Sequence, residues 1–75
     1  MLTVHEIHLI RNNEVEIYPF RDSRKDKWGY QLSTKIGNKN LPVYTCSAMY
    51  DGEGDARTNA KDLIAKARDD EFSWT

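Results

Sequence analysis

The stretch Trp28-Gly-Tyr-Gln-Leu-Ser-Thr-Lys-Ile36, which runs directly into Gly37-Asn-Lys-Asn40, decides the fold of this chain. Large or apolar side chains occupy every second position, and small or polar ones lie between them. This period of two predicts a strand with one buried and one solvated face. The face expected to be buried carries Trp28, Tyr30, Leu32, Thr34 and Ile36, and the solvated face carries Gly29, Gln31, Ser33 and Lys35.

Two further strands are expected beside this one. Residues 14–20 place Val15 and Ile17 on an inward face. Pro19 has no N–H to donate, so this strand either ends there or lies at an edge of the sheet. Residues 21–27 are all polar and predict a loop, and a third strand is expected over about 41–49, beyond the turn at 37–40.

The clearest helix signal lies near the C-terminal end. Apolar residues recur at the spacing of an amphipathic helix, at Ala56, Ala60, Leu63, Ile64 and Ala67. A helix is therefore expected over 51–69, with Asp51 or Asp55 as its cap, and its alanine face allows close approach to a sheet.

The first thirteen residues support two interpretations. Thr3 and Glu6 have the spacing of a capping box, which indicates a short helix. The density of β-branched and apolar residues, together with the turn-forming pair Asn12-Asn13, indicates a strand instead and slightly favours it. Together these elements predict a single α+β domain over residues 1–75: a three- or four-stranded antiparallel meander, one C-terminal helix packed on one face, and a tail over 70–75.

Composition limits the classes of function. Seventy-five residues leave space for a single core layer and none that is obvious for a deep active site. Cys46 is the single cysteine and is expected to be a half-buried side chain. With no charged leader and no long apolar run, we expect no signal peptide, no membrane span and a cytoplasmic location.

Charge is unevenly distributed along the chain. Residues 21–39 hold six bases and two acids, whereas residues 51–75 hold seven acids and four bases. The basic residues of the loop that leads into Trp28 are therefore candidates for binding a partner, and they are Arg21, Arg24, Lys25 and Lys27. A solvated loop that keeps the hairpin soluble is the alternative.

The aromatic residues of the tail also have two interpretations. Phe72 and Trp74 follow three acids. They either fold back on the sheet and enlarge the core, or they remain exposed as anchors for a partner.

Catalysis has little support in the sequence. His5 and His8 lie three residues apart without the further ligands that a metal site needs. The acids between Asp51 and Asp55 lack the closing glutamate of a calcium loop and are expected to stabilise the start of a helix. We therefore expect a non-enzyme that holds no metal or cofactor.

The order of a basic loop, a Trp28-x-Tyr30-x-Leu32 strand, a polar turn, a strand, Tyr50-Asp51 and an alanine-faced helix resembles a loose group of small proteins over about residues 14–68. The group includes uncharacterised bacterial and phage proteins and the arm-type DNA-binding domains of tyrosine recombinases. The resemblance implies a three-stranded sheet with a helix, and a sheet face that reads DNA through Gly29, Gln31, Ser33 and Lys35.

Two hypotheses of function follow. The first is a small protein-binding module, an inhibitor or adaptor of the kind that phages and mobile elements encode. It would bind through a sheet edge, the basic loop or the acidic helix surface, and a homodimer through a sheet edge belongs to the same class. The second is a nucleic-acid-binding domain that uses loop 21–27 and Trp28, with cations for phosphates and a ring for unpaired bases.

Overall fold

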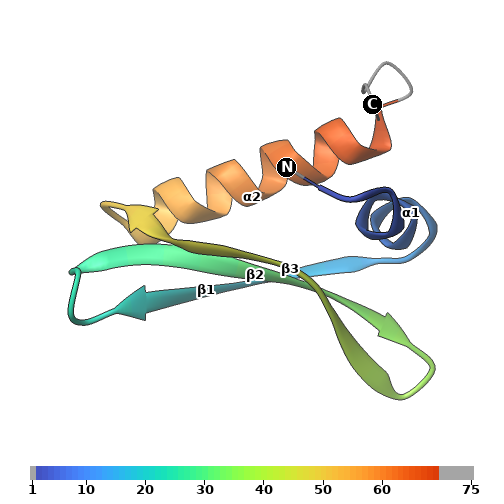
Figure 1. The fold of residues 1–75 in the computed structure, drawn as a ribbon, viewed down its shortest axis with the longest axis horizontal. Coiled ribbons are helices and arrows are strands. Elements are labelled where there is room, and N and C mark those ends of the chain that lie inside the picture. Colours follow the sequence, from blue (N-terminus) through green and yellow to red (C-terminus); the bar gives the residue numbers. More distant parts are fainter. Residues whose placement is uncertain (1, 70–75) are drawn as a thin grey trace.

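The computed structural model describes residues 2–69 as a three-stranded antiparallel sheet with two helices on one of its faces (Figure 1). The elements in chain order are α1 (Val4–Asn12), β1 (Val15–Asp22), β2 (Lys27–Ile36), β3 (Lys39–Tyr50) and α2 (Glu53–Arg68). The α+β class and the antiparallel meander are confirmed. The expectation of a single C-terminal helix is wrong, because a second helix precedes the sheet.

The sheet has the order β1-β2-β3, so β2 is the central strand and β1 lies at an edge, as Pro19 required. The short connection between β2 and β3 has a positive φ of 63° at Gly37. Glycine at the first central position of a two-residue hairpin loop is the pattern of a type II′ turn, whose twist matches that of the flanking strands.

The alternation predicted for β2 is confirmed at its centre and fails toward its end. Tyr30, Leu32 and Thr34 are buried beneath the helices, and Trp28 is half-buried. Ile36, at the end of β2, is exposed where the β2–β3 hairpin bends away from the helices (Figure 1). The opposite face is less solvated than expected, since Gly29 and Ser33 are buried between the neighbouring strands.

Gly29 is required by the path of β3. The register between β2 and β3 shifts at this glycine, between Trp28 and Tyr30, and the backbone of β3 lies close to it. A Cβ on Gly29 would lie 2.5 Å from the carbonyl oxygen of Cys46 and 2.7 Å from the ring of Phe20. A glycine is therefore needed where the irregular strand and an aromatic ring share one space.

Residues 4–12 form a helix, so the strand that was slightly favoured here is wrong. The capping box is present: the Thr3 hydroxyl accepts from the Glu6 backbone N–H at 3.1 Å, and the Glu6 carboxylate accepts from the Thr3 N–H at 3.2 Å. Ile7 and Ile10 are buried on one side of this helix. The local hydrogen bonds and the helical spacing of these isoleucines outweigh β propensity, which depends on context.

Helix α2 lies across the sheet on an alanine face, as predicted. Ala56, Ala60 and Ala67 are buried, and the helix packs mainly on β1 and β2 while α1 packs beside it. The expected cap is wrong, because Gly52 is the N-cap and makes no side-chain bond. Glu53 and Asp55 lie in the first turn, where negative charge stabilises the helix dipole.

The core is built around Tyr30. Its ring is flanked by those of Tyr44 and Tyr50, each at a centroid distance of 6.4 Å, and its hydroxyl donates to Oδ1 of Asn59 on α2 at 2.9 Å. Burial is the main cause of the raised pKa of Tyr30. Cys46 lies in the same cluster and is buried, more deeply than the half-burial expected for it.

Candidate interaction surface

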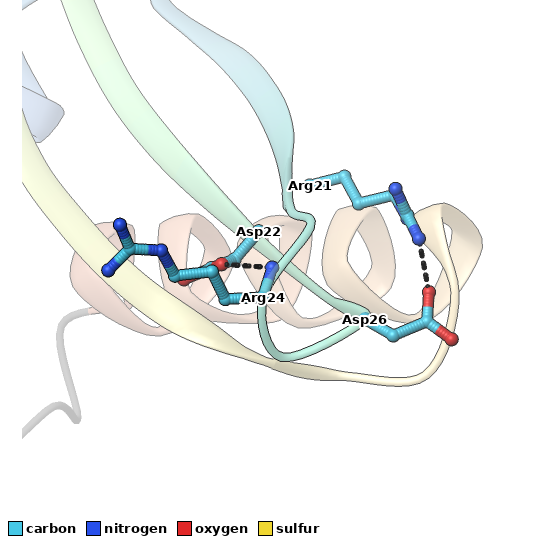
Figure 2. Close-up of polar contacts among 4 residues, drawn as sticks. All are labelled: Arg21, Asp22, Arg24 and Asp26. Atoms are coloured by element: carbon cyan, nitrogen blue, oxygen red, sulfur yellow. Dashed lines mark hydrogen bonds and ion pairs between the residues drawn. The ribbon is translucent and has the colours of Figure 1, made fainter.

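The loop between β1 and β2 pairs one of its four cations with an acid of its own (Figure 2). Arg21 pairs with Asp26 at 2.5 Å across the turn, and Asp26 has a φ of 52°. Asp22 Oδ1 accepts from the backbone N–H of Arg24 at 2.9 Å, which fixes the turn locally. The acids in this loop therefore shape the turn and compensate its charge.

Lys27 is also paired, with Asp51 in the segment that leads into α2. The hydrogen bond and charge of Asp51 raise the pKa of Lys27, and Lys27 lowers the pKa of the Asp51 carboxyl. Both side chains are exposed, so solvent screens the pair and its contribution to stability is small. The pair joins the loop to the start of α2, which lies at the same end of the molecule (Figure 1).

The four predicted basic residues therefore do not form one cationic patch. Only Arg24 and Lys25 lack an acidic partner among residues 2–69. The Arg24 side chain points away from the Arg21–Asp26 pair (Figure 2). The other two predicted partner-binding residues, Phe72 and Trp74, lie outside the described residues.

The helix surface is not acidic, contrary to one of the alternatives. Within Glu53–Arg68 the sequence holds three acids and four bases. The acid excess of residues 51–75 comes from the segments on either side of the helix.

A surface that the sequence reasoning missed lies on the face of the sheet opposite the helices. We call it the open face, and it comprises Tyr18 and Phe20 of β1, Gln31 of β2, and Thr45 and Met49 of β3. Cross-strand partners share a face. Tyr18 pairs with Gln31, Phe20 pairs with Gly29, and Gln31 pairs with Thr45. Met49 joins them by alternation with Tyr50, which pairs with Trp28 and packs against the core.

The open face exposes large apolar side chains. Tyr18, Phe20 and Met49 are 42%, 37% and 60% exposed. Polar bonds cross the same face, since Gln31 Nε2 donates to Thr45 Oγ1 at 3.4 Å and the Tyr18 hydroxyl donates to the Glu16 carboxylate. This last bond is the main cause of the raised pKa of Tyr18.

A signal for the open face is present in the sequence. Glu16, Tyr18 and Phe20 alternate with the inward Val15, Ile17 and Pro19, so two aromatic residues necessarily share the outward side of β1. Their exposure depends on what covers that side. Sequence alone does not reveal that both helices pack on the other face.

The described part of the chain forms neither a ligand pocket nor a metal site. Residues 2–69 contain no pocket and no group of three or more His, Cys, Asp or Glu side chains placed to hold a metal ion. His5 and His8 lie exposed on α1. Neither helix in this range has the length and apolar character needed to cross a membrane. No protein-family model, curated protein or solved structure matches the chain.

Proposed function

We propose that this protein is a small, non-enzymatic protein-binding module that docks through the open face of its sheet, as an inhibitor or adaptor does. One observation carries the proposal: Tyr18 and Phe20 are neighbouring aromatic side chains, two residues apart on one strand, and both are substantially exposed. Aromatic residues are enriched among the side chains that supply most of the binding free energy at protein interfaces.

The Phe20 ring packs on one side against the sheet. It lies against Gly29, where a Cβ would come within 2.7 Å of the ring. Binding through a side chain that is already ordered loses little rotamer entropy. The polar pair Gln31–Thr45 beside these rings can hydrogen-bond at the rim of such an interface.

The charge beside the two exposed rings favours a protein over a polyanion. The Glu16 carboxylate accepts a hydrogen bond from the Tyr18 hydroxyl and therefore lies beside the exposed rings. A carboxylate there repels phosphate, whereas it tolerates a mixed apolar and polar protein surface. The partner expected from this chemistry is a protein whose contact surface presents apolar side chains to Tyr18 and Phe20.

The test compares partner capture by matched variants. Tyr18→Ser and Phe20→Ser are expected to reduce the recovery of specific partners from host lysate at least tenfold, since removing an interface aromatic can weaken binding by about 2 kcal/mol or more. Val4→Ser removes an equally exposed apolar side chain from α1 and should leave recovery unchanged. Equal recovery by all three variants, with folding verified by circular dichroism, would refute the proposal.

A homodimer through a sheet edge is a narrower form of the same proposal. The outer edges of β1 and β3 have no neighbouring strand among residues 2–69. Each edge strand contains a proline without an N–H to donate, Pro19 in β1 and Pro42 in β3, so this criterion favours neither edge for pairing with another strand. Sedimentation of the full chain over a wide concentration range tests it, and a monomer throughout would exclude it.

Nucleic-acid binding is the second candidate, and the exposed cations of the β1–β2 loop favour it. Arg24 and Lys25 carry no acidic partner among residues 2–69. Affinity for single-stranded DNA or RNA should then fall steeply as salt rises, because counterions are released on binding. Arg24→Glu with Lys25→Glu should abolish it, whereas Lys61→Glu on α2 should have little effect, and absence of binding at low salt would exclude this function.

A further inference from the structure

The hairpin formed by β2 and β3 projects from the body of the protein. The pairing of β1 with β2 starts at Val15 and Thr34, so residues 35–41 form a ribbon of two strands only, which we call the hairpin tip. Thr34 is fully buried, whereas every residue of the hairpin tip is exposed. The hairpin bends away from both helices (Figure 1). Its tip is therefore accessible from both faces.

The hairpin tip carries positive charge that no acid compensates. Neither Lys35 nor Lys39 forms an ion pair with any residue between 2 and 69. The sequence has no Asp or Glu between Asp26 and Asp51, so the strands that lead to the tip bring no negative charge with them. The ligand that complements this surface is therefore anionic.

The two lysines lie on opposite faces of the ribbon. Lys35 pairs with Asn40, and the next pair along the strands is Ile36 with Lys39. Successive pairs point to opposite faces, so Lys39 shares a face with Ile36 whereas Lys35 shares the other with Asn40. A ribbon with one cation on each face matches a ligand that places anions on both sides of it.

The major groove of duplex DNA has this arrangement, because the phosphates of one strand line each of its walls. The groove is about 12 Å wide and about 8.5 Å deep, and it admits a two-stranded β-ribbon. Sheets stack about 10 Å apart, so a ribbon with its side chains fits this width. The three residues from Thr34 to Gly37 span about 10 Å along the strand, enough to bring the turn to the floor of the groove.

The uncharged side chains of the hairpin tip suit the edges of bases. Asn38 lies in the turn, and Asn40 follows in β3. In the major groove a carboxamide hydrogen-bonds N6 and N7 of adenine. The exposed Ile36 and Leu41 can contact the methyl group of thymine. Residues 35–41 contain no aromatic residue and no arginine, the residue types that anchor most protein interfaces, so this surface favours DNA over an acidic protein.

We propose that the hairpin tip enters the major groove of duplex DNA, with Lys35 and Lys39 on phosphates of opposite strands and Asn38 toward the base edges. Two phosphate contacts make this binding weak and sensitive to salt. The hairpin tip shares no residue with the open face, and it lies at the other end of the sheet from the loop between β1 and β2 (Figure 1). The proposal therefore stands or falls independently of the proposed function.

Fluorescence anisotropy of a short labelled DNA duplex, titrated with the full chain at low salt, tests the proposal. Lys35→Gln with Lys39→Gln should weaken binding about tenfold or more and reduce the slope of log affinity against log salt by about 2, one for each phosphate contact. Lys61→Gln with Lys66→Gln removes the same charge from exposed positions on α2 and should change neither quantity. Asn38→Ala should weaken binding without changing the slope, because its amide meets a base rather than a phosphate.

Four results would overturn the proposal, provided that circular dichroism shows each variant to be folded. The first is no binding of duplex DNA at low salt, and the second is an equal loss with the hairpin-tip and the α2 variants. The third is a loss with Arg24→Glu and Lys25→Glu that the hairpin-tip variants do not share, which would place the DNA at the other end of the sheet. The fourth is equally strong binding to polyglutamate or to vesicles of anionic phospholipid, which would show that the tip attracts any anionic surface.

Discussion

Arg11 and Arg68 each hydrogen-bond the carbonyl groups at the C-terminal end of the helix to which the other belongs. Arg11 of α1 donates from Nε to the Ala67 carbonyl at 2.5 Å and from Nη2 to that of Asp69 at 2.8 Å. Arg68 of α2 donates to the carbonyl oxygens of Ile10 and Asn13 at 3.4 and 3.1 Å. Two helix ends that leave carbonyls unpaired and carry partial negative charge are thereby satisfied by two guanidinium groups.

This reciprocal capping should make a measurable contribution to the free energy of unfolding. Arg11→Ala and Arg68→Ala should each lower the free energy of unfolding by about 1 kcal/mol, since each loses charge-assisted hydrogen bonds that are partly screened by solvent. Arg57→Ala disrupts only a surface pair with Glu53 at 3.6 Å. This substitution should change the free energy of unfolding by at most about 0.5 kcal/mol. Urea unfolding monitored by circular dichroism measures all three, and equal effects would contradict the capping role.

Thr34→Val is expected to stabilise the protein. The Thr34 hydroxyl is fully buried and has no hydrogen-bond partner among residues 2–69. An unpaired buried hydroxyl is unfavourable, and valine has nearly the same shape, so the free energy of unfolding should rise by about 1 kcal/mol. Thermal unfolding measures the change. Thr45→Val, at an exposed position bonded to Gln31, should give no gain, and a destabilised Thr34→Val variant would indicate a partner for this hydroxyl.

Gly29→Ala and Gly54→Ala should have opposite effects. At Gly29 the new Cβ would meet the Cys46 carbonyl oxygen at 2.5 Å and the Ala48 nitrogen at 2.9 Å, both backbone atoms that move only if β3 moves. Overpacking of this kind destabilises by about 1–3 kcal/mol. At Gly54, in the first turn of α2, the added Cβ would have no atom within 4 Å apart from the chain neighbours and backbone of its own helix. Alanine should therefore stabilise the helix by up to about 1 kcal/mol. Denaturant unfolding measures both variants. The contrast is refuted if the two midpoints both lie above, or both lie below, that of the wild type.

Alkaline pH should destabilise the protein through the buried Tyr30 and the half-buried Tyr44 and Tyr50. Burial is the main cause of the raised pKa values of Tyr30, Tyr44 and Tyr50. Above about pH 10 the unfolded chain loses these protons while the folded chain keeps them, so the unfolded state binds fewer protons and stability falls as pH rises. The stability is fully present below that pH. Tyr30→Phe should reduce the dependence of unfolding free energy on pH above 10, although it also loses the bond to Asn59. An unchanged alkaline slope would show that Tyr30 is not responsible.

Most of the sheet and α2 could be predicted because their patterns are local. The alternation from Tyr30 to Thr34 and the alanine spacing from Ala56 to Ala67 each require one buried side, whatever covers it. The secondary structure of the N-terminal segment is harder to predict, because Val4, Ile7 and Ile10 suit either a strand or a helix. The capping box of Thr3 and Glu6 was the signal that identified the correct structure there.

The candidate binding residues could be predicted only in part. The basic loop lies between β1 and β2 as predicted, but it is shorter than the predicted 21–27, because β1 continues to Asp22 and β2 begins at Lys27. Arg21 and Lys27 are compensated by Asp26 and Asp51, and Asp51 lies twenty-four residues from Lys27 in sequence. Charge counting along the chain does not show such a pairing. Phe72 and Trp74 lie outside the described residues and remain a prediction.

The sequence by itself determined which residues form the strands and α2 and which side of each element is apolar, because these follow from periodicity and turn chemistry. Only the tertiary structure decided that both helices cover the same face of the sheet. That choice leaves Tyr18 and Phe20 exposed on one side, whereas Ile36 and Leu41 are exposed on the hairpin that bends away from the helices. The physical reason is that exposure is a property of the whole packing: a side chain is buried only where another element lies over it.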